Sequence, residues 1–196
     1  MTKIPPAPGG SPPHRRRALL RTHALPGRYF HAPEIYQREG ERIFRSHWLC
    51  VAHAADLALP GAYLALQVER QPLLLIREGR DGVRGYYNIC RHRGTLRGAI
   101  RCPYHGWSYD WQGKLLAAPH MDDVAGFRLE DYPLQSVAVA QWNGLLFVYL
   151  GETPAPLEQE LAPLWNKFAA WEFQGWRPAW QHVYEIAANW KLVLEN

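Results

Sequence analysis

The chain has 196 residues, 47% of them hydrophobic and 20% charged, and its formal net charge is +4 at pH 7. Such a composition is typical of a globular domain with room for part of a second one, and it excludes a disordered, collagen-like or coiled-coil chain. Basic and acidic residues are interspersed along the sequence, so we expect no nucleic-acid partner. No apolar run reaches the roughly 18 residues of a membrane span, so we expect a soluble protein without a membrane partner.

The N-terminal residues and the cysteines bear on location. Residues 1–24 are basic and proline-rich, and their arginine triplet at 15–17 is not followed by the apolar stretch of an export signal. We therefore interpret residues 1–24 as a flexible arm. The three cysteines, Cys50, Cys90 and Cys102, can form at most one disulfide, whereas secreted scaffolds carry more. Both observations favour a cytoplasmic location.

The predicted elements begin with a helix at 33–48, where apolar side chains recur at spacings of three and four residues and Pro33 suits a first turn. Beyond it the pattern changes to short apolar runs separated by turn signals such as 69–71 and Asp81-Gly82. These runs predict strands at 62–68, 72–77, 85–89, 136–140 and 145–150, and a hairpin that pairs 108–110 with 114–116 across 111–113. Many short strands at close spacing indicate a mainly β protein, an antiparallel sandwich or small barrel that follows an N-terminal helix.

The character of the sequence changes after Gly151. A linker-like stretch at 153–156 precedes an amphipathic helix at 157–171, and 181–186 is expected to form a strand. A last helix begins near 187–196, with Asn189 as its N-cap. We interpret this region as a short α-helical extension that opens a second domain.

Two cysteine–histidine pairs lie within sixteen residues, Cys90 with His92 and Cys102 with His105. In an extended segment Cys90 and His92 point to the same side, and a glycine adjoins each pair, where a backbone wrapped around an inorganic centre needs room or a positive φ. This paired spacing favours a metal site over buried core side chains. Two thiolates and two imidazoles suit either a tetrahedral zinc ion or a two-iron cluster with cysteines on one iron and histidines on the other.

The residues around the pairs favour the cluster. The string Cys90-x-His92-Arg-Gly and Cys102-Pro-Tyr-His105-Gly-Trp-x-Tyr109 resembles the Rieske domain of ring-hydroxylating oxygenase large (α) subunits. The resemblance extends to the preceding helix, to a strand at 48–53, and to the Asn-Trp-Lys-x-x-x-Glu-Asn motif at 189–196, which is similar to the first helix of the catalytic domain in those enzymes. It implies a Rieske [2Fe–2S] domain at 25–152, followed at 153–196 by a linker helix and the beginning of the catalytic domain.

The same resemblance implies roles for individual residues. Cys90 and Cys102 would bind the inner iron of the [2Fe–2S] cluster, His92 and His105 the outer and more exposed iron, and Tyr109 would approach a cysteine sulfur. Electrons would come from NAD(P)H through a reductase, a ferredoxin or both. They would leave for a mononuclear Fe(II) site whose ligands lie downstream in the family. The chain is thus expected to be a non-heme iron oxygenase component, an oxidoreductase that holds no catalytic residue itself. In the full-length homotrimer the small-molecule substrate would be an aromatic ring or a quaternary amine.

One departure from the family concerns the connection between the two pairs. Nine residues separate His92 from Cys102, fewer than is usual in the family. This spacing leaves two alternatives open: a structural zinc-binding module that uses the same four ligands, and a non-functional truncated fragment without metal.

Other residues have weaker signals. Cys50, in an apolar strand, is expected to be a small buried side chain. His53, His120 and His182 are expected at the surface or in hydrogen bonds, and the tryptophans from Trp142 onward in a core or a domain interface. Around the two pairs, four arginines are either solvated charges or a docking surface for an acidic ferredoxin or reductase: Arg91, Arg93, Arg97 and Arg101.

Overall fold

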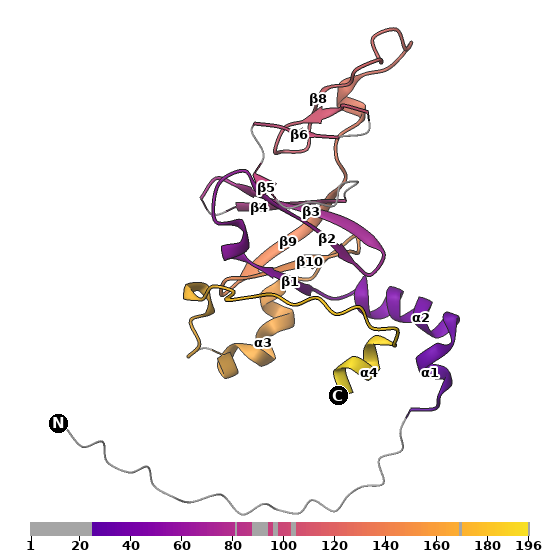
Figure 1. The fold of residues 1–196 in the computed structure, drawn as a ribbon, viewed down its shortest axis with the longest axis vertical. Helices are drawn as coiled ribbons and strands as arrows, with labels where there is room; N and C mark the ends of the chain where they lie inside the picture. Colours follow the sequence, from indigo (N-terminus) through magenta and orange to yellow (C-terminus); the bar gives the residue numbers. More distant parts are fainter. Residues whose placement is uncertain are drawn as a thin grey trace, which may run out of the picture.

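A large and a small antiparallel sheet form the body of the protein. The computed structural model describes residues 25–80, 82–87, 94–95, 98–102, 105–168 and 170–195. Figure 1 shows the large sheet in the middle of the molecule, the small sheet above it and the described helices of both chain ends below. Among these residues no helix is both long enough and apolar enough to cross a lipid bilayer.

The large sheet has seven strands in the order β1-β10-β9-β4-β3-β2-β5 and nearly closes into a barrel. Its strands are β1 (Leu49–His53), β2 (Ala62–Val68), β3 (Gln71–Glu78), β4 (Gly82–Tyr87), β5 (Gly94–Thr95), β9 (Ser136–Trp142) and β10 (Leu145–Tyr149). Their alternation of short apolar runs and tight turns confirms the predicted mainly β class, and β2 has the predicted bounds. Of the strand predicted at 85–89, positions 88 and 89 lie outside the described residues, as does Asp81 of the predicted turn.

The small sheet contains β6 (Ile100–Arg101), β7 (Ser108–Tyr109) and β8 (Leu115–Ala117), in that order. β7 and β8 form the hairpin that the sequence predicts across 111–113. The small sheet stands on one face of β3. On that face Leu74 and Ile76 are buried with Tyr86, and Ile100 and Leu134 pack against them. The opposite face of β3 contributes to the main core, so β3 is covered on both sides, as its continuous apolar run requires.

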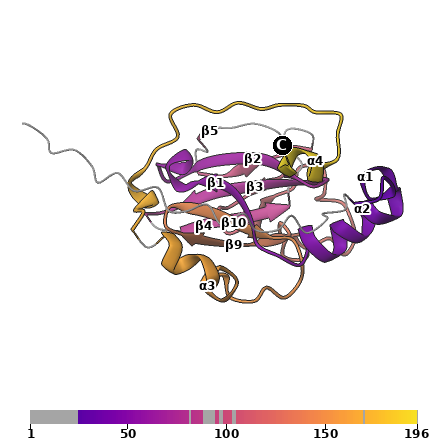
Figure 2. The same cartoon turned by 90° about the horizontal axis from the view of Figure 1, so that it is seen from below.

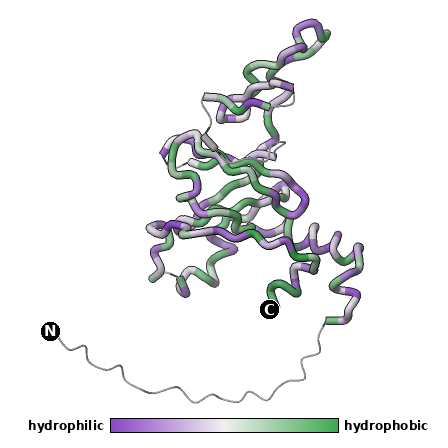
Figure 3. The backbone as a smooth tube through the Cα atoms, viewed as in Figure 1, coloured by the Kyte–Doolittle hydropathy of each residue, from purple (hydrophilic) through white to green (hydrophobic). Residues whose placement is uncertain are grey.

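The main core lies inside the large sheet, where Figure 3 shows hydrophobic residues along the strands. Its fully buried side chains come from β3, from β10 and from the 3-10 turn that precedes β2, and are Leu57, Leu73, Leu75, Leu146 and Val148. Burial of a leucine or valine contributes about 1.5 to 3 kcal/mol, so these residues hold the sheet closed.

The N-terminal helical region differs from the prediction in its last turn. After α1 (Arg28–His31), α2 (Pro33–Glu39) starts at the expected proline and continues into a π-helical turn, η1 (Gly40–Phe44). The amide of Arg45 donates to the carbonyl oxygen of Gly40 at 3.0 Å, which closes this wider turn. The helix therefore ends before the predicted residue 48. Two short 3-10 turns, η2 (Ala54–Leu57) and η3 (Leu129–Asp131), follow β1 and β8.

The C-terminal region runs along the outside of the large sheet (Figure 2). It contains α3 (Leu157–Phe168), the 3-10 turn η4 (Phe173–Gly175) and α4 (Trp190–Glu195). The N-cap prediction is confirmed, because the side-chain oxygen of Asn189 accepts from the amide of Lys191 at 3.1 Å. The strand predicted at 181–186 is wrong: this segment pairs with no strand among the described residues, and an extended run becomes a strand only when a neighbour takes its hydrogen bonds.

Candidate metal centre

One loop carries both Cys102 and His105. β6 and β7 pair through Ile100 with Tyr109 and Arg101 with Ser108, and the loop between them begins at Cys102. The amide of Cys102 donates to the carbonyl oxygen of Trp107 at 2.8 Å, and the amide of Gly106 donates to the carbonyl oxygen of Cys102 at 2.9 Å. Two short strands and two backbone hydrogen bonds thus fix both ends of a six-residue turn.

Gly106 is the position in this turn that needs glycine. Its φ is +72°, in the left-handed region that other residues adopt at a cost. A Cβ added there would have ordinary contacts of 3.6 Å with Pro119 and 3.8 Å with Arg101. The requirement is therefore conformational rather than steric. The sequence prediction of a glycine with positive φ beside the second pair is confirmed.

Both residues with candidate donor atoms in the loop lie at least partly at the surface. Cys102 forms no disulfide and is partly exposed, and His105 is exposed. Cys90 and His92 lie outside the described residues, between the end of β4 and the start of β5. Within the part of the chain that the structure describes, no three histidine, cysteine or acidic side chains come close enough to hold a metal ion.

The nine-residue connection between the two pairs links the two sheets. Within it, β5 pairs with β2 at the edge of the large sheet, through Ala62 with Thr95 and Tyr63 with Gly94. β6 follows as the first strand of the small sheet. The short connection therefore still contains one strand of each sheet, and β6 leads directly into the Cys102 loop.

Tyr109 lies on β7, close to the Cys102 thiol. Burial, and then the charge of the nearby Cys102, raise the pKa of the Tyr109 hydroxyl above its ordinary value. The phenol therefore stays protonated and remains a hydrogen-bond donor at neutral pH. Trp107, at the end of the loop, packs edge-on against Phe127 and Tyr132, with ring centroids 5.7 and 5.8 Å away.

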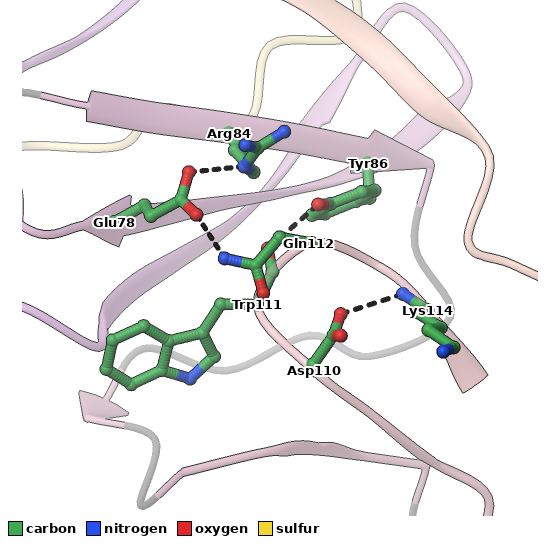
Figure 4. A network of polar contacts seen from close by, with 7 residues as sticks. All are labelled: Glu78, Arg84, Tyr86, Asp110, Trp111, Gln112 and Lys114. Atoms are coloured by element: carbon green, nitrogen blue, oxygen red, sulfur yellow. Dashed lines mark hydrogen bonds and ion pairs between the residues drawn. The ribbon is translucent and has the colours of Figure 1, made fainter. Parts of the chain in front are cut away.

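The tip of the β7–β8 hairpin is attached to the large sheet by a polar network (Figure 4). The Tyr86 hydroxyl donates to the carbonyl oxygen of Trp111 at 2.8 Å. Glu78 of β3 accepts from Gln112 at the hairpin tip and from Arg84 of β4. Sequence reasoning missed these residues, because Glu78 and Gln112 are 34 positions apart and no local pattern pairs them.

Two of the weaker expectations have clear outcomes. His53 is hydrogen bonded, as expected: its Nδ1 accepts from the amide of Ala55 at 3.1 Å, and its Nε2 lies 2.9 Å from the carbonyl oxygen of Phe173. The expectation of a buried Cys50 is wrong, since Cys50 is exposed. Leu49 and Val51, on either side of Cys50, pack against the main core, so Cys50 points to the opposite face of β1.

The other histidines and the late tryptophans lie at or near the surface. His120 and His182 are exposed, and the ring of His182 lies between those of Trp180 and Tyr184. Trp142 packs on Trp165 of α3, whereas Trp180 is 74% exposed. The expected packing thus holds for Trp142 but not for Trp180 within the described chain.

Residues 47–133 match the family model of the Rieske [2Fe-2S] domain. The chain is 33% identical over 182 residues to the glycine betaine monooxygenase oxygenase subunit of Chromohalobacter salexigens, covering 89% of this chain and 41% of that one. It is 31% identical over 183 residues to the carnitine monooxygenase oxygenase subunit of Acinetobacter baumannii, covering 88% and 49%. The crystal structure of the apo form of the quaternary ammonium Rieske monooxygenase CntA superposes with a TM-score of 0.81 at 26% identity, over 88% of this chain and 53% of that one.

The fold and the matched region define a Rieske [2Fe–2S] domain. The chain that carries it is homologous to the oxygenase subunits of glycine betaine and carnitine monooxygenases, and it spans less than half the length of these two relatives. These homologues are oxygenase subunits of monooxygenases, a class of oxidoreductases.

A Rieske domain implies a [2Fe–2S] cluster, and the described loop fits one. Such a cluster takes cysteine thiolates on one iron and histidine imidazoles on the other. The β6–β7 loop presents one donor of each kind, three residues apart, on a backbone closed by two hydrogen bonds.

Proposed function

We propose that the chain binds a [2Fe–2S] cluster through Cys90, His92, Cys102 and His105 and relays electrons within an oxygenase of small quaternary amines. The observation that carries this proposal is the closed loop that presents Cys102 and His105 inside the matched Rieske domain. When bound, such a cluster accepts and releases single electrons. Cys90 and Cys102 would hold one iron as thiolates, and His92 and His105 would hold the other.

The exposure of the loop supports an electron-transfer role. His105 is exposed, so the side of the cluster that it would hold faces the surface, where a redox partner can approach. Arg101, also exposed, directly precedes Cys102. A positive charge here complements an acidic ferredoxin or an NAD(P)H-dependent reductase, and Arg91, Arg93 and Arg97 would add to it.

The C-terminal region supports a division into two functional parts, with the cluster in 25–152 and the start of a catalytic part in 153–196. Val183 and Tyr184 are 80% and 76% exposed, a degree of apolar exposure that is typical of a covered interface. The relatives are about twice as long as this chain, so the remainder of such a polypeptide is the partner proposed for this surface. The mononuclear iron, the substrate and the contacts of a homotrimer would belong to that remainder.

The deciding experiment measures iron and acid-labile sulfide, with an EPR spectrum of the dithionite-reduced protein. We expect about two irons per chain and a Rieske-type signal. Cys102→Ser and His105→Ala should lose both, whereas Cys50→Ser, which changes an exposed cysteine on β1, should keep both. Bound zinc would instead support the structural zinc module, and a chain with no metal would support the non-functional fragment.

The substrate class needs a separate measurement on the whole oxygenase subunit with its reductase. We expect glycine betaine or carnitine to stimulate oxygen consumption, because the relatives that match most of this chain are oxygenase subunits of glycine betaine and carnitine monooxygenases. Stimulation by an aromatic hydrocarbon alone would assign the chain to the ring-hydroxylating branch instead.

A further inference from the structure

The loop with Cys102 and His105 has two connections to the large sheet. On one side, Ile100 of β6 packs on the buried cluster of Leu74, Ile76 and Tyr86. On the other side, the carbonyl oxygen of Trp107 accepts from the Cys102 amide, and the carbonyl oxygen of Trp111 accepts from the Tyr86 hydroxyl. Only residues 108–110 lie between these two tryptophans. The hairpin tip is therefore the second support of the loop, and movement at the tip is transmitted through a strand two residues long.

The tip itself is closed tightly, so it acts as one unit. The amide of Asp110 donates to the carbonyl oxygen of Lys114 at 3.0 Å, and the amide of Lys114 donates to the Asp110 carboxylate at 2.8 Å. Gly113 has φ +82°, and a Cβ added there would lie 2.6 Å from the Tyr86 ring. The backbone of the tip thus rests directly on the aromatic ring of β4.

Glu78 supplies the negatively charged acceptor in this attachment. One carboxylate oxygen accepts from Gln112 of the tip and the other from Arg84 of the neighbouring strand (Figure 4). Because Arg84 holds the carboxylate on the large sheet, Gln112 meets an acceptor whose direction is already fixed. Hydrogen bonds to a charged acceptor are stronger than neutral ones, so this bond restrains the tip more than a neutral pair would.

We propose that Glu78 is a positioning residue for the Cys102–His105 loop: through Gln112 it fixes the hairpin tip on the large sheet and so sets how the loop presents its two donors. This inference rests on the proposed function, in which the loop holds part of the cluster. It adds that residues of β3 and of the hairpin tip, which bind nothing themselves, determine the geometry of the site.

The first test is hydrogen–deuterium exchange of the loop amides of Cys102 and Gly106, which can be followed with or without a cluster. Glu78→Ala and Gln112→Ala should each raise their exchange rates about tenfold, the equivalent of one lost charge-assisted hydrogen bond. The double variant should exchange no faster than either single one, because both changes break the same bond. Glu78→Gln should restore much of the protection, since its amide oxygen still accepts from Gln112.

Two control variants separate positioning from general stability. Arg84→Ala removes the ion pair but leaves the Gln112 bond, so loop exchange should rise much less than in Glu78→Ala. Glu130→Gln removes another Arg–Glu pair, formed with Arg128 two positions away, and it should leave loop exchange unchanged. Unchanged loop exchange in Gln112→Ala would overturn the proposal.

The cluster gives a second readout that distinguishes this inference from the proposed function. In protein that holds two irons, Gln112→Ala should keep the iron but shift the EPR g-values and the reduction potential, while Glu130→Gln should match wild type. Identical spectra and potentials in Gln112→Ala would overturn the positioning role and leave the cluster intact. Wild-type protein without iron would overturn the proposed function, and the exchange experiment would still decide the role of Glu78.

Discussion

At the scale of single residues, Gly113 and Gly126 form a natural comparison. Both have φ near +80°, but a Cβ at Gly113 would collide with the Tyr86 ring, whereas nothing lies within 4 Å of a Cβ at Gly126. The two positions therefore share the requirement for a positive φ and differ only in the room available for a side chain.

Replacement of each glycine by alanine should separate these two effects. Gly126→Ala should lower the free energy of unfolding by about 1 kcal/mol, the cost of a left-handed backbone. Gly113→Ala should cost about 1 to 3 kcal/mol more, because the added methyl group must displace the hairpin tip or the ring. Urea unfolding of the two variants checks the difference, and equal losses would show that the tip yields freely.

At the scale of elements, Glu39 connects the two ends of the described chain. Its carboxylate, on α2, accepts from Trp190 Nε1 at 2.9 Å and from Lys191 Nζ at 2.5 Å on α4, and Trp190 packs edge-on against Phe44. Burial opposes ionisation of Glu39, but the hydrogen bonds from Lys191 and Trp190 outweigh it and hold the pKa of Glu39 below its ordinary value. The helix predicted at the C-terminus is thus held by a contact across 152 positions.

This contact predicts how the attachment of α4 depends on pH. A carboxyl group whose pKa is lowered in the folded state stabilises that state above its unfolded pKa, and the stabilisation is lost as the pH falls through the folded value. Protection of α4 from proteolysis should therefore be constant near neutral pH and decrease in acid, and Glu39→Gln should weaken it near neutral pH and flatten the dependence. Glu34→Gln, at an exposed position on the same helix, should behave as wild type. An unchanged pH profile in Glu39→Gln would contradict this account.

At the scale of the whole molecule, two regions lie at opposite ends of the large sheet. The small sheet with the Cys102–His105 loop stands above it, and α4 with the helices of the N-terminal half lies below (Figure 1). Between α2, the β2–β3 turn and residues 184–193 runs an open groove of about 1140 Å³. The proposed cluster and the exposed apolar surface are thus on different faces, so one can meet a redox partner while the other is covered.

The exposed apolar surface predicts self-association of this chain by itself. Val183 and Tyr184 should make sedimentation dependent on protein concentration, since uncovered apolar area favours contacts between copies. Val183→Lys combined with Tyr184→Ser should reduce this dependence without lowering the melting temperature by more than about 2 °C, because exposed side chains contribute little to folding. A wild-type chain that is monomeric at all concentrations would contradict the prediction.

The sequence by itself determined the elements whose signals are local. The strand bounds of β2, the β7–β8 hairpin and the Asn189 cap each depend on a few neighbouring residues, and the Cys102–His105 spacing with Gly106 identified the loop. These features follow from alternation, turn chemistry and backbone conformation, which act over short distances along the chain.

Only the tertiary structure decided the features that depend on distant partners. Residues 181–186 join neither sheet of the described chain, because strand formation needs a neighbouring strand that local sequence does not specify. Cys50 is exposed, because its neighbours Leu49 and Val51 pack against the core, and only packing decides which face of an apolar strand is buried. The attachment of Gln112 to Glu78 depends on how two sheets pack, and since packing brings together residues that are far apart in sequence, no local pattern could have predicted it.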